Sequence, residues 1–178
     1  MTRWRPGDRR ADAASMLRVN QAGEYGATRI YAGQLAVMRR NSPGSRLVAR
    51  MAGQEERHLQ LFNAMMAERR VRPTMLQPVW NLAGFALGAA TALMSEEAAL
   101  ACTEAVETEI DEHYGSQLDD LGQQDPELAA AITEFRAEEV EHRDVAREAG
   151  AANAVGYPLL TAAIRAGCRV AIGLSKRI

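Results

Sequence analysis

The chain has 178 residues, a formal net charge of −2, and a composition that is 47% hydrophobic but only 5% aromatic. This length allows one domain with a substantial core, expected over residues 1–178, and excludes two full-sized domains. Two cysteines are too few for a disulfide framework or a zinc motif, which favours a reducing compartment. No secretory signal is recognised, no nucleic-acid partner is expected, and residues 1–12 are predicted to be flexible.

The first two predicted helices carry carboxylates and a histidine at helical spacing. Residues 13–40 form the first helix, which contains Glu24 and ends before an Asn-Ser-Pro-Gly breaker. Residues 45–70 form the second helix, which contains Glu55 and His58. Because residues i and i+3 share one face of a helix, Glu55 and His58 can point the same way.

The next segment, residues 79–94, is apolar on every side of a predicted helix. Its 16 residues are fewer than the roughly 20 that a membrane-spanning helix needs. Small residues at Gly84, Gly88 and Thr91 would let another helix or a lipid approach closely. A buried core helix, a membrane-dipping segment and the wall of an apolar substrate channel are the alternatives.

Two further helices repeat the pattern of the first two. Residues 95–121 form one helix, which contains Glu107, and residues 126–149 form the other, which contains Glu139 and His142. Pro126 suits the first turn of a helix because the amide hydrogen that proline lacks would have no helical partner there.

The last segment, residues 158–178, is predicted to be an amphipathic helix. Arg165, Arg169 and Lys176 fall on a different face from its apolar residues. Basic amphipathic helices commonly lie in a membrane interface, whereas the alternative is a fifth helix packed on the bundle. Residues 159–178 carry four cations and no acid, while the middle of the chain is acidic and suits cation binding.

One arrangement of ligand residues occurs twice in the sequence: a glutamate is followed 31 or 32 residues later by a Glu-x-x-His pair. The chain has three histidines, and two of them belong to such pairs. Four carboxylates and two imidazoles, shared among four helices, are the ligand set of dimetal sites inside four-helix bundles. The predicted ligands, which are also the predicted catalytic residues, are Glu24, Glu55, His58, Glu107, Glu139 and His142.

Four carboxylates that face one another inside a bundle would repel unless cations lie among them. Glu55 and Glu139 are placed to bridge two ions. The remaining ligands complete the two sets, Glu24 with His58 and Glu107 with His142. Oxygen-rich ligation with one imidazole for each ion suits iron or manganese.

Residues around the predicted ligands are assigned more loosely. Tyr31 and Tyr114 follow Glu24 and Glu107 by seven residues, so each shares a face with its glutamate and can hydrogen-bond to a ligand carboxylate. The alternative for each tyrosine is an ordinary core position. Asp111 is placed to accept a proton from a ligand histidine. His113 lies on another side of its helix and is not predicted to be a ligand.

Several stretches of the sequence resemble the demethoxyubiquinone hydroxylase family. They are Asn20-Gln-Ala-Gly-Glu-Tyr-Gly-Ala27, the Glu55-x-x-His58 helix, Gly84-Phe-Ala-Leu-Gly-Ala89, Ala101-Cys-Thr-x-Ala-Val-Glu107 with His113-Tyr114, and Glu138-Glu139-x-Glu141-His142. The resemblance runs from about Met16 to Ile178. Generic ferritin-like proteins share the six ligands but not these surrounding stretches.

The resemblance implies a ferritin-like diiron monooxygenase of ubiquinone biosynthesis, with two iron ions held by the six ligands. Such an enzyme hydroxylates the ring of a polyprenyl demethoxyubiquinol with O₂ and takes electrons from NADH or from the quinol. It also implies a peripheral protein on the cytoplasmic side of a cell membrane, and leaves open a lipid-presenting partner protein. The rival hypotheses are a ferritin-like ferroxidase or iron-storage protein, a manganese catalase, and a metal-free membrane-binding module.

Overall fold

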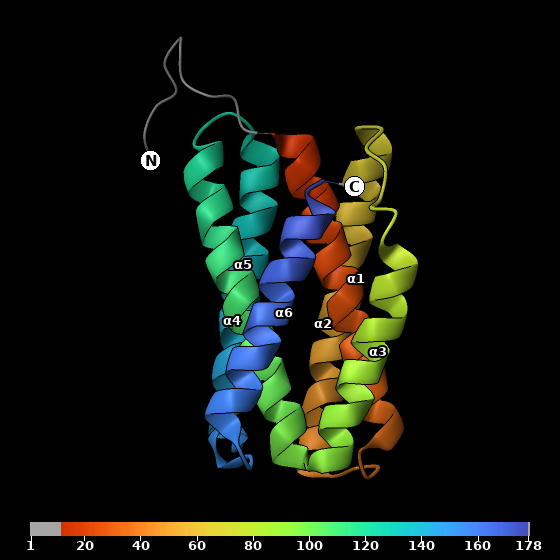
Figure 1. Ribbon diagram of the computed structural model, residues 1–178. Coiled ribbons are helices and arrows are strands. Elements are labelled where there is room, and N and C mark those ends of the chain that lie inside the picture. Colours follow the sequence, from red (N-terminus) through yellow and green to blue (C-terminus); the bar gives the residue numbers. More distant parts are fainter. Residues whose placement is uncertain (1–11, 178) are drawn as a thin grey trace.

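Helices account for most of the computed structural model, which describes residues 12–177 (Figure 1). The elements are α1 (Ala13–Val37), α2 (Pro43–Glu68), α3 (Gln77–Met94), α4 (Glu96–Leu121), α5 (Pro126–Glu148), the 3₁₀ turn η1 (Ala151–Asn153) and α6 (Tyr157–Ser175). No strand occurs within residues 12–177. The predicted all-α fold is confirmed, and every predicted helix is present with ends shifted by a few residues. The expected flexibility of the N-terminus falls almost wholly outside the described residues.

Two antiparallel hairpins, α1–α2 and α4–α5, make the four-helix bundle (Figure 1). Each hairpin turn is short and ends at a side-chain cap, because Ser42 accepts a hydrogen bond from the Ser45 amide and Asp125 accepts one from the Leu128 amide. Gly122 follows the last residue of α4 and has a φ of 54°, a value that favours glycine. Short turns of this kind hold consecutive helices side by side.

Helix α3 connects the two hairpins and packs against the outside of α1 through glycines. A Cβ atom on Gly88 would lie 1.9 Å from the Ile30 carbonyl oxygen, and one on Gly33 would lie 2.1 Å from the Phe85 carbonyl oxygen. The outer side of α3 is exposed, with Leu82 74% accessible. Residues 79–94 therefore form a surface helix, which excludes the alternative of a buried core helix.

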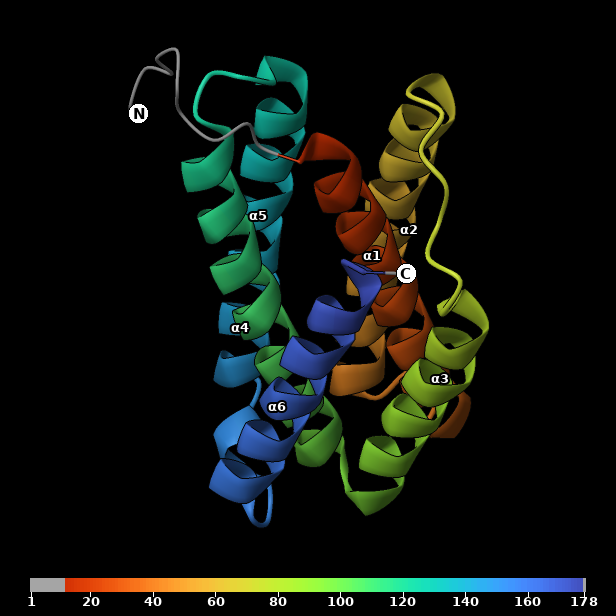
Figure 2. The same cartoon turned by 45° about the horizontal axis from the view of Figure 1, so that its top comes forward.

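Helix α6 lies along α4 and reaches α1, so α3 and α6 flank α1 on the side away from α2 and α5 (Figures 1 and 2). Ile164 is buried against the bundle. The basic face differs from the expectation: Arg165 and Arg169 both donate to the buried Glu109 on α4, the second at 2.8 Å. The side of α6 that faces outward is apolar, and Leu159 is 79% exposed.

Three apolar clusters pack the described helices, and two of them lie on either side of a polar zone in the bundle. Tyr31, Val48, Met51 and Leu100 belong to the cluster nearer the α1–α2 turn. The cluster nearer the α4–α5 turn includes Leu17, Phe62, Met65, Tyr114, Leu128 and Phe135. Of the helices described, none combines the length and apolar character needed to cross a membrane.

Candidate metal centre

The six predicted ligands meet in the polar zone between the two apolar clusters. Helices α1 and α4 each contribute one glutamate, and α2 and α5 each contribute one Glu-x-x-His pair, because residues i and i+3 lie on the same inward face. All six side chains are buried, none more than 2% exposed. Burial of four carboxylates together is costly unless cations or protons compensate for their charge.

The ligand atoms form two overlapping groups, and within each group they lie no more than 4.8 Å apart. Glu55 and Glu139 belong to both groups, which is the position required of bridging carboxylates. The first group adds Glu24 and His58, and the second adds Glu107 and His142. His58 Nδ1 lies 3.1 Å from Glu139 Oε1, and His142 Nδ1 lies 3.1 Å from Glu55 Oε1.

Several polar atoms at this centre are buried without a hydrogen-bond partner. They are Glu24 Oε2, Glu107 Oε2, both carboxylate oxygens of Glu55 and Glu139, and Nδ1 of His58 and His142. A buried polar group without a partner costs about 1–3 kcal/mol. Because these orphaned atoms converge and belong to oxygen-rich sets with one imidazole each, the residues fit two first-row metal ions such as iron or manganese.

Two tyrosines hold the remaining carboxylate oxygens across the bundle. Tyr31 on α1 donates to Glu107 Oε1 on α4, and Tyr114 on α4 donates to Glu24 Oε1 on α1. Each tyrosine therefore contacts the glutamate of the opposite half, which leaves Oε2 of both glutamates directed at the centre. Burial and the neighbouring carboxylates raise the pKa of both phenols well above the usual value, so they stay protonated donors.

The outer nitrogens of both histidines contact residues that the sequence pattern did not predict. His58 Nε2 lies 3.0 Å from Glu138 Oε2, and His142 Nε2 lies 3.1 Å from Gln54 Oε1. Gln54 and Glu138 each stand immediately before the ligand glutamate of a Glu-x-x-His pair. The twofold repeat of the motif could have indicated both positions.

Asp111 does not fill the role expected for it. Its carboxylate accepts hydrogen bonds from Arg136 Nε at 2.6 Å and from Arg143 Nη1 at 3.0 Å, which link α4 to α5. His113, which was not predicted to be a ligand, lies 2.8 Å from the amide nitrogen of Gln117.

Several groups of the centre hold a proton more tightly than usual when no metal is bound. Burial and the neighbouring carboxylates raise the pKa of Glu55 and of Glu107 well above the usual value, and burial also raises that of Glu139. For His58, burial lowers the pKa, but the neighbouring carboxylates of Glu139 and Glu24 outweigh this effect and raise it to about 10. Burial lowers the pKa of His142.

The thermal stability of the metal-free protein is therefore expected to fall as the pH rises from 7 to 9. Unfolded glutamate and histidine side chains have lost their protons by pH 7, whereas the folded centre retains several because the pKa values of Glu55, Glu107, Glu139 and His58 are raised. Each retained proton costs about 1.4 kcal/mol of stability per pH unit. Calorimetry of the chelated protein would measure the slope, and His58→Gln should reduce it. A melting temperature independent of pH across this range would contradict the retained protons.

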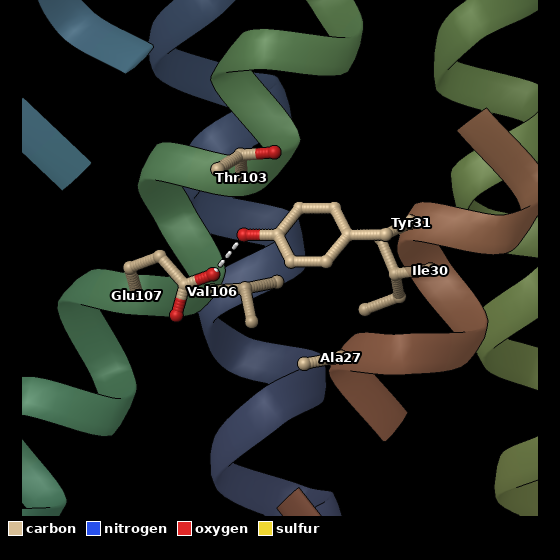
Figure 3. A pocket seen from close by; sticks show the side chains of 6 residues that line it. All are labelled: Ala27, Ile30, Tyr31, Thr103, Val106 and Glu107. Atoms are coloured by element: carbon tan, nitrogen blue, oxygen red, sulfur yellow. Dashed lines mark hydrogen bonds between the residues drawn. The ribbon is translucent and has the colours of Figure 1, made fainter. Parts of the chain in front are cut away.

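A small pocket lies beside Glu107, between α1 and α4 (Figure 3). It is lined by Ala27, Ile30, Tyr31, Thr103, Val106 and Glu107. Figure 3 shows the Tyr31 ring extending from α1 toward the Glu107 carboxylate, with the apolar side chains around it. The pocket thus joins an apolar wall to one of the ligand carboxylates.

Comparisons with known proteins relate nearly the whole chain to one family. A family model described as ubiquinone biosynthesis protein COQ7 matches residues 11–175. A 3-demethoxyubiquinol 3-hydroxylase of Rhodospirillum rubrum is 52% identical over 162 residues, covering 91% of this chain and 76% of the relative. The mitochondrial NADPH-dependent 3-demethoxyubiquinone 3-hydroxylase of Homo sapiens is 50% identical over 173 residues, covering 95% and 79%. The mitochondrial 5-demethoxyubiquinone hydroxylase of Saccharomyces cerevisiae is 43% identical over 179 residues, covering 92% and 77%.

Proposed function

The chain belongs to the COQ7 family of ubiquinone biosynthesis proteins, and we propose that it hydroxylates the ring of a polyprenyl demethoxyubiquinol with O₂ at a pair of iron ions. It is a hydroxylase of ubiquinone biosynthesis, as its relatives are. The single observation that carries the iron pair is the convergence of buried, unpartnered carboxylate oxygens and imidazole nitrogens from four helices. Membership of this family does not favour the alternative of a ferritin-like iron-storage protein.

Glu55 and Glu139 would bridge the two ions. The other ligands would complete the two positions, Glu24 with His58 and Glu107 with His142. When bound, the iron pair would supply the redox chemistry that places one oxygen atom of O₂ on the ring. The chain holds the ligands in place: Tyr31 and Tyr114 fix the outer oxygens of two carboxylates, and the apolar clusters on both sides exclude water.

The pocket beside Glu107 is the proposed point of approach for the ring. Its lining brings the apolar side chains of Ala27, Ile30 and Val106 next to the Glu107 carboxylate. The polyprenyl tail would remain outside the bundle. We propose a reduced nicotinamide nucleotide or the quinol as the electron source, since several relatives are named as NADPH-dependent. A lipid-presenting partner protein stays a prediction.

A single-turnover assay tests the proposed function. The iron-loaded, reduced protein would be mixed with O₂ and a short-chain demethoxyubiquinol, and the product quantified by mass spectrometry. A gain of one oxygen atom, labelled when ¹⁸O₂ is used, is the expected result. Oxidised iron retained without product would instead support a ferroxidase, and full turnover with manganese alone would contradict iron as the metal.

The exposed apolar sides of α3 and α6 are the proposed membrane contact, with the cytoplasmic side of a cell membrane as the predicted location. The contact residues are Val79, Leu82, Phe85, Leu93 and Met94 on α3 with Leu159, Val170 and Leu174 on α6. Both helices flank α1, so their outer sides can meet one surface. Because Arg165 and Arg169 already pair with Glu109, the attraction is expected to be mainly apolar and little affected by salt.

The double variant Leu82→Glu/Leu159→Glu is expected to lower vesicle binding more than tenfold, because each leucine contributes about 1.5–3 kcal/mol on burial. Co-sedimentation with phosphatidylcholine–phosphatidylglycerol vesicles would measure the change. Gln123→Glu/Thr133→Glu, which adds the same charge at exposed positions of the α4–α5 hairpin, is the matched control. Equal binding by the two double variants would contradict this contact surface.

A further inference from the structure

The two Glu-x-x-His pairs are held by residues that differ in charge. Glu138, which precedes the pair on α5, accepts a hydrogen bond from His58 on α2, and Gln54, which precedes the pair on α2, accepts one from His142 on α5. The contacts therefore cross between the two hairpins. One histidine meets a carboxylate, whereas the other meets a neutral amide.

The chemistry of these contacts fixes the direction of every hydrogen bond. The Glu138 carboxylate only accepts, so the amide nitrogen of Gln54, 3.2 Å away, must donate to it. The amide oxygen of Gln54 is then left for His142, whose Nε2 must carry the proton. By the same reasoning His58 Nε2 donates to Glu138. Both Nδ1 atoms, which face the carboxylates of the centre, are thereby left to hold an ion.

A histidine that donates to a carboxylate is a stronger metal ligand than one that donates to an amide, because the negative charge polarises the N–H bond and makes the ring more basic. The charge of Glu138 is also supported by Arg57, whose guanidinium nitrogen lies 2.6 Å from it. The two halves have the same other ligand types. In each half the glutamate that does not bridge, Glu24 or Glu107, accepts a hydrogen bond from a tyrosine. The charge around the two histidines differs at residues 54 and 138, and also at Arg57 and Glu141, which directly precede the histidines.

We propose that the Gln54–Glu138 pair makes the two metal positions unequal, so that the position with His58 and Glu24 fills before the position with His142 and Glu107. Gln54 and Glu138 are thus positioning residues that act through the histidines. The inference rests on the metal centre of the proposed function. It goes further because it assigns an order to the two ions and names the residues that set the order.

The test uses cobalt(II), which resembles iron(II) in its ligands but is not oxidised by air. Crystals of the full chain grown with one equivalent of cobalt would give the occupancy of each position by anomalous scattering, and competition titration would give the two stepwise affinities. In the natural sequence the occupancy at the His58 position is expected to exceed that at the His142 position about tenfold, within the 10- to 100-fold range typical of outer partners of metal ligands.

The exchange variant Gln54→Glu/Glu138→Gln keeps the net charge and side-chain sizes and is expected to reverse the preference. Glu138→Gln alone, which gives both histidines a neutral partner, should bring the two occupancies within about threefold. Both positions are only partly buried, and melting temperatures of the metal-free variants would check the fold.

Equal occupancy in the natural sequence, or an unchanged preference in the exchange variant, would overturn this inference while leaving the metal centre intact. Absence of cobalt from both positions would overturn the metal centre and the inference with it. A purely structural role for the pair would lower both affinities together and would not reverse their order.

Discussion

Replacement of Glu139 by alanine is expected to abolish ring hydroxylation and to leave the bundle folded. Its two carboxylate oxygens face both histidines, at 3.1 Å from His58 Nδ1 and 3.3 Å from His142 Nδ1, so its loss affects both metal positions. The loss of activity should exceed the 10- to 100-fold that removal of an outer partner of a ligand costs. The metal-free fold should survive, because the change removes one of four mutually repelling buried carboxylates.

Single-turnover product yield, metal content and the melting temperature of the metal-free protein would be measured together. Glu55→Ala, which removes the other shared carboxylate, is expected to behave in the same way. Glu141→Ala is the matched control, since Glu141 lies on the same helix but is exposed to solvent. Residual activity above a tenth of the natural level in either ligand variant would contradict the bridging assignment.

Substitution of Gly88 by alanine is expected to destabilise the protein by about 2–3 kcal/mol, as overpacking of a tight interface usually does. The added Cβ would lie 1.9 Å from the Ile30 carbonyl oxygen, which is backbone and cannot rotate away. Helix α3 must therefore move outward from α1. Chemical denaturation would give the free energy of unfolding, and Gly33→Ala should show the same direction of change.

Gly53→Ala provides a control of opposite sign. Gly53 lies within α2 and its Cβ would meet no atom within 4 Å, so alanine should stabilise the helix by about 0.5–1 kcal/mol. A Gly88 variant as stable as the Gly53 variant would show that α3 does not pack on α1 through its glycines.

The helices and the grouping of the ligands could be predicted because both depend on local spacing. A Glu-x-x-His pair lies on one face of any helix, and proline and glycine mark where each helix ends. The seven-residue step from glutamate to tyrosine also placed Tyr31 and Tyr114 correctly on the inner face. Each tyrosine contacts the glutamate of the opposite half. Sequence spacing could not predict this contact, because it depends on how α1 and α4 cross.

The remaining differences also come from packing between helices. Asp111 lies one turn beyond Glu107 along α4, yet its direction is set by two arginines of α5 that sequence spacing does not bring to it. The basic residues of α6 looked suited to a membrane surface, but two of them pair with Glu109 on α4. In α3 the glycines indicated a close approach without indicating which helix would approach.

The crossing contacts make the two hairpins dependent on each other. Each proposed metal position would take at least one ligand from the opposite hairpin, since Glu139 completes the first group and Glu55 the second. A pair of bound ions would therefore act as a cross-link between segments some eighty residues apart, closing a long loop in the chain. The metal-bound protein would then unfold only when both hairpins release the ions together. Metal occupancy would therefore set how cooperatively the whole bundle unfolds.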